Sequence, residues 1–205
     1  MIRSLFEGCI RNISGPIGIK VRRWYYTRRL KTCGTKLTVS EGVYFDNPSC
    51  ISLGDFVWVD RGSKLIAGKI ESENVIQKES ESPVPQGFIS IGDEAHIGVD
   101  TILQGHGGIS IGNNFTSSPS TKIYSLSNDV KKSKHGTNSK NTNNRFYISS
   151  PILIANNVWF GVNTLMVSGQ VEDDTFIQPN SIVNGRFPKN SVIGGNPAVR
   201  FGDRF

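Results

Sequence analysis

From Leu37 onward, apolar positions recur every six residues, and a small or polar residue often follows each of them. The clearest series are Leu53, Val59 and Leu65; Ile91, Ile97 and Leu103; Ile111, Ser117 and Ile123; Ile154, Phe160 and Met166; and Val171, Ile177 and Val183. This spacing fits neither an α-helix nor an alternating strand, and self-similarity at a fixed period predicts a repeat architecture. Three units make one triangular turn, so stacked turns bury a continuous ladder of aliphatic side chains.

Two polar segments interrupt this period, and we predict that both leave the corners of coils as loops. The first covers residues 69–87 and contains proline, and the second covers residues 129–150 and is rich in Lys, Asn and Ser. Loops on a rigid scaffold commonly carry binding groups. A solvated, disordered excursion is the alternative interpretation of each loop tip.

The segment before the repeat predicts an amphipathic helix that begins after Ser14 and stops by Gly34, with Pro16 tolerated in its first turn. Its apolar residues fall close to one helical face: Ile17, Val21, Trp24, Tyr25 and Leu30. We therefore divide the chain into a helical arm, residues 1–36, and a repeat domain, residues 37–205.

The formal net charge of +6 is a property of this arm. Residues 1–36 hold nine Lys or Arg and one Glu, whereas the rest of the chain is slightly acidic. This asymmetry argues against a uniformly basic nucleic-acid binder. A basic amphipathic helix with Trp and Tyr at its boundary is typical of a segment that lies on an anionic membrane surface, here through residues 1–31. A helix that caps the domain and points its charges at water is the alternative.

The composition excludes other classes of protein. No apolar run approaches the length of a transmembrane helix, and the three cysteines form no CxxC motif, so neither a zinc site nor a disulfide framework is indicated. Cys33 and Cys50 are predicted to be packing residues. A reducing cytoplasm fits best, and residues 1–16 lack the pattern of a cleaved signal peptide.

Three stretches near the C-terminal end carry a family resemblance. Ile-Ala-Asn-Asn-Val-Trp-Phe-Gly at 154–161, Ile-Gln-Pro-Asn-Ser-Ile-Val at 177–183 and Gly-Gly-Asn-Pro-Ala at 194–198 resemble the C-terminal signature of hexapeptide-repeat acyltransferases. The resemblance implies an all-β fold, a left-handed parallel β-helix, with acetyl-CoA as co-substrate and active sites at the interfaces of a homotrimer. The handedness comes from the family, because crossover connections are otherwise right-handed.

The arm sharpens this resemblance. Residues 15–26, Gly34 and the stretch Val-Tyr-Phe-Asp-Asn-Pro at 43–48 resemble the sugar O-acetyltransferases of bacterial O-antigen, capsule and exopolysaccharide pathways. This implies an acetyl-CoA-dependent O-acetyltransferase that acts on a sugar hydroxyl of a cell-surface polysaccharide precursor by direct attack in a ternary complex. It would work in the cytoplasm, at the inner face of the membrane.

Such a transfer needs a base that takes the hydroxyl proton, and histidine is the natural candidate. In the family the base commonly follows an Ile-x-x-x-x-Asn pattern, and here Asn128 and Asp129 stand at that position after Ile123. This is a departure, since an exposed aspartate has a pKa near 3.9 and is a feeble base toward an alcohol. Asp129 is still able to orient an acceptor or a neighbouring imidazole.

The chain has three histidines, His96, His106 and His135. His106 lies in a Gly-His-Gly-Gly element one coil before the expected position, and coils stack about 4.8 Å apart, so it is the first candidate for the base with Asp129 as partner. It could instead support a Gly-rich corner. His135 would reach the cleft only if its loop closes, and His96 is typical of a surface residue.

The resemblance implies that pantetheine lies along a groove between neighbouring subunits. The matching positions are Trp159, Gly161, Ser168 and Gly169, although Trp159 could equally be a packing residue. Arg186, Lys189 and Arg200 could meet the phosphates of coenzyme A, and each could equally be a plain surface charge. No Walker, GxGxxG or metal-ligand pattern competes with this assignment.

Two alternatives remain open. One is N-acetylation of an amino sugar, which relies less on a strong base. The other is a catalytically impaired β-helix that serves as a scaffold or binding module, which the missing histidine at Asn128 and Asp129 favours. The acceptor of an enzyme could be a sugar, a nucleotide-sugar or a lipid-linked saccharide.

Overall fold

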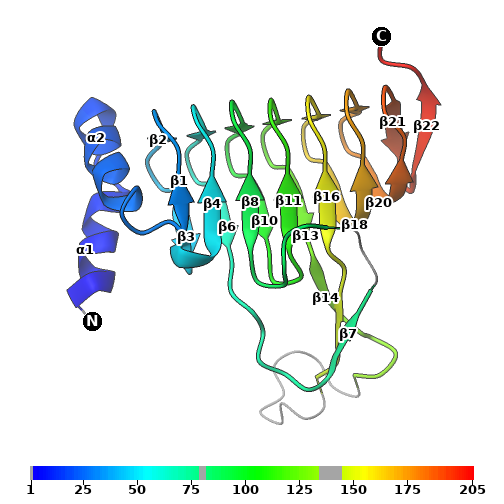
Figure 1. Cartoon of the computed structure of the whole chain (residues 1–205), viewed down its shortest axis with the longest axis horizontal. Helices are drawn as coiled ribbons and strands as arrows, with labels where there is room; N and C mark the ends of the chain where they lie inside the picture. The colour runs from blue at the N-terminus through cyan, green and yellow to red at the C-terminus, as the bar shows by residue number, and fades with distance from the viewer. Residues whose placement is uncertain (1, 79–81, 134–144) are drawn as a thin grey trace.

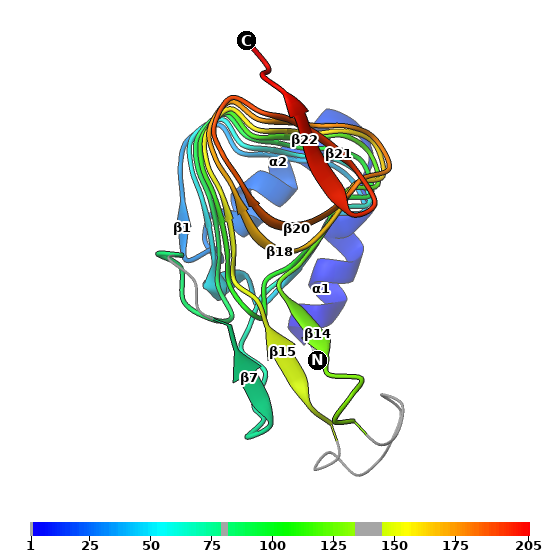
Figure 2. The same cartoon turned by 90° about the vertical axis from the view of Figure 1, so that its right-hand side faces the viewer.

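The computed structural model describes residues 2–78, 82–133 and 145–205, and over these residues the chain forms a left-handed parallel β-helix. Figure 1 shows the coils side by side along the long axis, with two helices at one end. Viewed along that axis the coils superpose as a triangle, and one corner carries an extension (Figure 2). The predicted all-β solenoid is therefore confirmed.

Three faces make the triangle, and each of the earlier coils contributes one short strand to each face. The first face holds β1 (Thr32–Cys33), β4 (Ile51–Leu53), β8 (Ile89–Ile91), β11 (Ile109–Ile111) and β16 (Ile152–Ile154). The second face holds β2 (Thr38–Val39), β5 (Trp58–Val59), β9 (His96–Ile97), β12 (Thr116–Ser117), β17 (Trp159–Phe160), β19 (Phe176–Ile177) and β21 (Val192–Gly195). The third face holds β3 (Tyr44–Asp46), β6 (Lys64–Ile66), β10 (Ile102–Gln104) and β13 (Lys122–Tyr124).

In the last coils, the strands of the third and first faces merge into one longer strand. Strands β18 (Leu165–Val171) and β20 (Ile182–Phe187) run around the corner from the third face to the first without a break, because β18 pairs with β13 through its first residues and with β16 through its last. Strand β22 (Ala198–Gly202) pairs antiparallel with β21 and lies across the C-terminal end (Figure 1). A short 3-10 turn, η1 (Pro48–Cys50), precedes β4.

The six-residue period places one residue type above another in successive coils. Ile91 pairs with Leu53 on one side and with Ile111 on the other, and Ile111 pairs with Ile154. All four side chains are at most 3% exposed. Each coil alone could not bury these groups, so the stability of the solenoid comes from contacts between neighbouring coils.

Side-chain oxygens link the coils at the corner after the first face. Asp93 Oδ1 accepts the backbone N–H of Asp55 at 2.7 Å, and Asn113 Oδ1 accepts that of Asp93 at 2.8 Å. The same close stacking requires a glycine directly before Asp55 and Asp93. A Cβ on Gly54 would lie 2.3 Å from Asp93 Oδ1, and one on Gly92 would lie 2.3 Å from Asn113 Oδ1. The Gly-Asp and Gly-Asn pairs of the repeat are thus requirements of close coil contact.

The helical arm consists of two helices, α1 (Ile2–Arg11) and α2 (Gly15–Tyr26). The predicted helix after Ser14 is confirmed as α2, but it ends at Tyr26, and α1 was not predicted. The apolar residues of this segment do not share one environment. Ile17 and Trp24 are 72% and 54% exposed, whereas the residues of α2 that are buried are Gly18, Arg22 and Tyr26.

Unpaired backbone carbonyls at the N-terminal end of the β-helix explain which side of α2 faces inward. The first strand of the second face, β2, has no preceding coil to accept hydrogen bonds from, and its carbonyls would be unpaired at the edge. Arg22 Nε donates to the Val39 carbonyl at 3.0 Å, and Arg23 Nε donates to the Leu37 carbonyl. Two of the arm's charges are therefore used to cap the solenoid.

Arg22 also connects the two helices. Its Nη1 donates to the carbonyls of Ile10 at 3.1 Å and Ile13 at 2.7 Å, which end or follow α1 and have no helical partner. Arg22 is 1% exposed, and this desolvation lowers the pKa of its guanidinium from the ordinary value. One turn further along α2, Tyr26 packs on Phe45 at 4.6 Å between ring centroids, and burial raises the pKa of Tyr26 to about 12.

Both interrupting segments leave the corner between the third and first faces, which we name the loop corner. The first segment contains β7 (Val75–Gln77), and the second is flanked by β14 (Leu126–Asn128) and β15 (Tyr147–Ser149). These strands pair in the order β14-β15-β7 and form a small sheet that projects from the body, as Figure 2 shows. Their pairing across the two segments was not indicated by the sequence. Cys33 and Cys50 pack against the core as predicted.

Candidate active site

His106 lies at the loop corner, directly after β10 and between the two coils from which the long segments leave. Gly105, Gly107 and Gly108 surround it and are buried. A Cβ on Gly107 would lie 2.0 Å from the carbonyl oxygen of Ser125, one coil further along. The glycines therefore allow this corner to pack closely against the neighbouring coils. His106 is the one residue of the Gly-His-Gly-Gly element that has a side chain.

A backbone carbonyl from the preceding coil orients the His106 ring. Nδ1 lies 2.7 Å from the carbonyl oxygen of Gly68, which begins the first long segment. A carbonyl only accepts, so in the neutral ring Nδ1 carries the hydrogen and Nε2 keeps a lone pair. Among the residues that the structure describes, Nε2 makes no hydrogen bond. The half-buried ring is thus held in the tautomer that a general base requires.

A pocket of about 200 Å³ opens beside His106. It is lined by Ile70, Gln104, His106, Leu126, Ser127, Asn128 and Tyr147. The pocket brings His106 together with Asn128, the predicted residue at the position where the family commonly has its base. Ile70 and Tyr147, which come from the two long segments, were not found by sequence reasoning, because only the pairing of β7 with β15 carries them to this corner.

Asp129 lies at the outer end of β14 rather than beside His106 in the coil stack. In register, His106 is next to Leu126, since Gln104 pairs with Tyr124 and the N–H of Gly107 meets Ser125 Oγ at 2.9 Å. The Asp129 side chain is 8% exposed, and its Oδ1 accepts the backbone N–H groups of Lys131 and Lys132 at 3.0 and 3.2 Å. Its visible role is to fix the turn that follows β14.

The other two histidines are placed differently. His135 falls outside the described residues. His96 lies on the second face of the β8–β10 coil, where its ring stacks on Trp58, and it takes no part in the pocket of His106.

A second hollow lies at the same corner, toward the C-terminal end. It measures about 140 Å³ and is lined by Lys78, Ser150, Pro151, Ser168, Gly169, Gln170 and Arg186. Three of the predicted cofactor residues, Ser168, Gly169 and Arg186, therefore converge here. Lys78 joins them from the first long segment, directly after β7, where its backbone N–H binds the carbonyl of Ser149 at 2.8 Å. Two basic side chains at one small polar hollow can hold a phosphate group.

The remaining predicted cofactor positions lie elsewhere. Trp159 is on the second face, 47% exposed, with its indole N–H donating to Ser118 Oγ at 3.0 Å. Gly161 is buried, and a Cβ there would lie 2.6 Å from the backbone nitrogen of Pro179, so stacking explains this glycine without a ligand.

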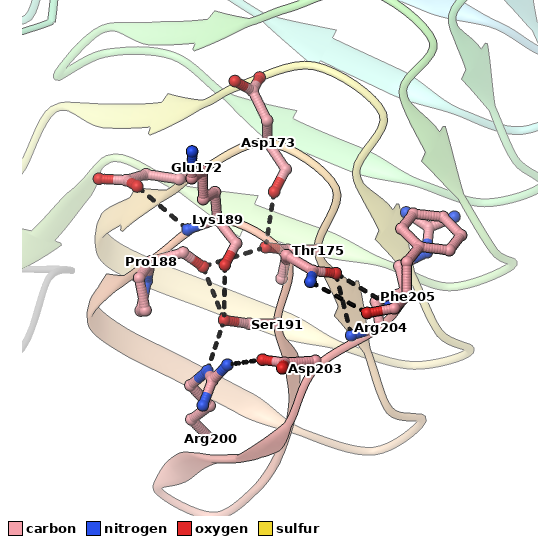
Figure 3. A network of polar contacts seen from close by, with 11 residues as sticks. Glu172, Asp173, Thr175, Pro188, Lys189, Ser191, Arg200, Asp203, Arg204 and Phe205 are labelled. Carbon is pink, nitrogen blue, oxygen red and sulfur yellow. Dashed lines mark hydrogen bonds and ion pairs between the residues drawn. The ribbon is translucent and has the colours of Figure 1, made fainter.

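Lys189 and Arg200 belong to a network at the C-terminal end, shown in Figure 3. The backbone N–H of Lys189 donates to Glu172 Oε2 at 3.0 Å. Arg200 donates to Ser191 Oγ at 2.9 Å and pairs with Asp203. The Arg200 guanidinium is therefore engaged in fastening β22, and neither residue lines the hollow of Ser168.

A larger hollow adjoins the pocket of His106. It measures about 900 Å³ and is lined by Ile70, Glu71, Ser72, Glu73, Asn74, Arg145 and Tyr147. Ile70 and Tyr147 line both spaces, so the two hollows are neighbours at the base of the projecting sheet. Within the described residues no group of three His, Cys, Asp or Glu side chains could hold a metal ion. Nor is any described helix long and apolar enough to cross a membrane.

No known family model matches the chain. Its structural neighbours are hexapeptide-repeat acyltransferases. AntD, an N-acyltransferase from Bacillus cereus in complex with dTDP and 3-hydroxybutyryl-CoA, superposes with a TM-score of 0.73 at 17% identity over 90% of this chain and 88% of that chain. A maltose O-acetyltransferase from Clostridium difficile 630 gives 0.60 at 18% identity over 95% and 80%. A hexapeptide-repeat acetyltransferase from Vibrio cholerae gives 0.60 at 18% over 97% and 88%. At these identities the likeness establishes the left-handed β-helix fold.

Proposed function

We propose that this protein is an acyl-CoA-dependent acyltransferase that moves an acetyl group from acetyl-CoA to a hydroxyl of a sugar. The observation that carries the proposal is the His106 ring, whose Nδ1 is fixed on the Gly68 carbonyl while Nε2 borders a pocket at the loop corner. A general base needs a fixed ring with a free lone pair at a pocket, whereas a packing residue does not.

In the proposed reaction, Nε2 of His106 takes the proton of the acceptor hydroxyl as the hydroxyl oxygen bonds to the thioester carbonyl carbon. The carbon–sulfur bond then breaks, and the proton passes from His106 to the departing thiolate, so the ring returns to its neutral state. The Gly68 carbonyl faces the Nδ1–H throughout and favours the transient positive charge of the ring. Asn128 lines the same pocket and is able to bind the acceptor.

The two hollows suit the two substrates. The 900 Å³ space is lined by carboxylates, hydroxyls and an arginine, groups that bind sugar hydroxyls, and it shares Ile70 and Tyr147 with the pocket of His106. The smaller hollow places Lys78 and Arg186 beside Ser168, a polar and basic site that fits a phosphate of coenzyme A. AntD was solved with a CoA thioester and dTDP, which supports an acyl-CoA donor and a nucleotide-sugar among the candidate acceptors.

An amino sugar is the second candidate acceptor. It is favoured by the likeness to AntD, an N-acyltransferase solved also with dTDP-4-amino-4,6-dideoxyglucose. It is favoured too by Asn128 at the position where the family commonly has its base. We rank the hydroxyl first because an alcohol depends more on a base such as the oriented imidazole than a neutral amine does, since the amine is the stronger nucleophile.

The finer assignments belong to this proposal as well. We place the enzyme in the cytoplasm, in the synthesis of O-antigen or another cell-surface polysaccharide, as a homotrimer that touches the inner face of the membrane through its helical arm.

The test is release of free coenzyme A from acetyl-CoA by the full chain, with hydroxyl sugars, nucleotide-sugars and amino-sugar nucleotides offered separately. His106→Asn is the informative variant, because the amide nitrogen can still donate to the Gly68 carbonyl while the base is gone. We expect turnover to fall by about 10²- to 10⁴-fold with an unchanged melting temperature. Full turnover by His106→Asn would exclude His106 as the base, and no turnover of any acceptor by the wild type would overturn the enzyme assignment in favour of a scaffold.

A further inference from the structure

A closed circuit of hydrogen bonds joins His106 to the two ends of the first long segment. The Nδ1–H of His106 donates to the carbonyl of Gly68 at 2.7 Å, where the segment leaves its coil. The N–H of Gly68 donates to the carbonyl of Gly87 at 2.7 Å, where the segment returns. The N–H of Gly87 donates to the carbonyl of His106 at 3.0 Å and closes the circuit. The orientation of the ring therefore depends on where both segment ends lie.

The two glycines leave no room for side chains within this circuit. Gly68 has a φ of 104° and Gly87 a φ of 83°, conformations that glycine adopts readily and other residues do not. A Cβ on Gly87 would lie 2.6 Å from the backbone nitrogen of Lys69. A side chain that holds Gly68 in place must therefore come from outside the circuit.

Asn47 supplies this support from the turn that follows β3. Its Nδ2 donates to the carbonyl of Ala67 at 2.9 Å, and the N–H of Ala67 donates to the carbonyl of Asp46 at 3.2 Å. A Cβ on Gly68 would lie 2.7 Å from Asn47 Nδ2, so the amide lies directly against Gly68. All four backbone N–H and C=O groups of residues 67 and 68 are thus hydrogen-bonded, and Asn47 is the residue that holds the Ala67 carbonyl.

Asn47 acts on the base only through the backbone. It belongs to the Val-Tyr-Phe-Asp-Asn-Pro stretch at 43–48, and it lines none of the three hollows at the loop corner. Its φ is 49°, a left-handed conformation that asparagine tolerates better than most side chains do. The left-handed turn directs the amide toward the peptide between Ala67 and Gly68.

We infer that Asn47 is a positioning residue for the base. By holding residues 67 and 68, its amide keeps the Gly68 carbonyl in line with the Nδ1–H of His106, and the lone pair of Nε2 stays at the pocket. This inference rests on the proposed function, in which Nε2 takes the proton of the acceptor. Without the amide the Gly68 carbonyl is free to turn, and the neutral ring can carry its hydrogen on either nitrogen.

The first test is kinetic. Asn47→Asp replaces the amide nitrogen by an oxygen in nearly the same shape, so an acceptor faces the Ala67 carbonyl in place of a donor. We expect kcat to fall about tenfold, the factor that one hydrogen bond commonly contributes, with the KM for acetyl-CoA and for the acceptor unchanged. Asn47→Gly keeps the left-handed backbone without the charge and should lower kcat as well. An unchanged kcat in both variants would overturn the inference.

Asn190→Asp is the matched control. Asn190 also has a positive φ, 55°, and its Nδ2 donates to the backbone carbonyl of Phe205 at 3.2 Å, at the opposite end of the solenoid. This variant loses the same kind of bond and gains the same charge, and we expect its kcat to equal that of the wild type. An equal fall in kcat for Asn190→Asp would show a general loss of structure and would overturn the positioning role.

The second test separates positioning of the base from support of the substrate sites. If Asn47 acts through His106, adding Asn47→Asp to His106→Asn lowers turnover no further, because the base is already absent. A further fall of about tenfold in the double variant would show that Asn47 acts elsewhere, and the inference would be wrong.

The third test observes the ring directly. Nitrogen NMR spectra of the full chain with isotope-labelled histidine, at a pH where the rings are neutral, show which ring nitrogen carries the hydrogen. We expect Nδ1 of His106 to carry it in the wild type and in Asn190→Asp, and a shift of the population toward Nε2 in Asn47→Asp. An unchanged His106 tautomer in Asn47→Asp would overturn the inference. A wild type that acetylates no acceptor would remove the proposed function, whereas the spectra would still decide whether Asn47 holds the ring.

Discussion

At the scale of single residues, the side chains that matter most are fixed by atoms from another coil. The His106 ring takes its orientation from the carbonyl of Gly68, thirty-eight positions earlier. The same principle governs the corner after the first face, where Asp55 Oδ1 accepts the backbone N–H of Thr35 at 2.5 Å and its hydroxyl at 2.9 Å. These bonds favour the charged carboxylate and hold the pKa of Asp55 below its ordinary value.

This carboxylate predicts a defined response to acid. A lowered pKa in the folded state contributes stability above the unfolded pKa, near 3.9, and that stability is lost as the pH falls through the folded value. Asn113 occupies the equivalent position two coils later and accepts the same kind of bond, so Asp55→Asn fits without titrating. We expect the urea midpoint of the wild type to fall further than that of Asp55→Asn between about pH 5 and pH 3. Exposed Glu94→Gln is the control, and parallel profiles for the wild type and Asp55→Asn would contradict the assignment.

At the scale of elements, the two helices act as a lid on the open end of the solenoid. The α2 helix buries an arginine, because the edge of β2 and the end of α1 present carbonyls that need donors. At the other end β22 does the corresponding work by pairing with β21. The first and last coils are thereby protected from pairing with other chains.

Replacement of Arg22 tests this capping role. Arg22→Met removes the side-chain donor from the carbonyls of Val39, Ile10 and Ile13, and we expect a loss of unfolding free energy on the order of 3 kcal/mol. Lys20→Met, on the exposed side of the same helix, is the matched control and should stay close to the wild type. Urea denaturation followed by circular dichroism measures both, and equal stability of the two variants would show that the edge carbonyls find other donors.

At the scale of the whole molecule, the face that α1 and α2 turn outward combines apolar and basic groups. Leu5, Ile17 and Trp24 are 65%, 72% and 54% exposed, and the neighbouring Lys20 and Arg28 are exposed as well. Apolar side chains among cations are suited to the headgroup region of an anionic bilayer. The basic residues of this surface are those of the arm that do not cap the solenoid, as Arg22 and Arg23 do.

Vesicle co-sedimentation tests this surface. We expect Ile17→Glu/Trp24→Glu to lose most binding to vesicles that contain phosphatidylglycerol, with an unchanged melting temperature. Phe201→Glu, which changes a 61% exposed ring at the opposite end, should bind as the wild type does. Deletion of the arm is a poorer experiment, because it also removes the cap. Equal vesicle binding by all three proteins would show that Ile17 and Trp24 belong to an ordinary solvent-exposed face.

The amino-acid sequence by itself determined the solenoid, the start of α2, the placement of His106 at a corner and the concentration of charge before residue 37. These features are periodic or local, and each can be read from a few neighbouring positions. It also pointed to Ser168, Gly169 and Arg186, which the structure brings to one hollow.

Only the tertiary structure decided which groups meet across long stretches of chain. The pairing of β7 with β15 carries Ile70 and Tyr147 to the pocket of His106, and in the turn after β14 the Asp129 carboxylate accepts the N–H groups of Lys131 and Lys132. The buried contacts of α2 were decided in the same way. Hydrophobic periodicity reports what a helix can bury, whereas the unpaired carbonyls of Val39 and of α1 determined that Arg22 is the side chain it does bury.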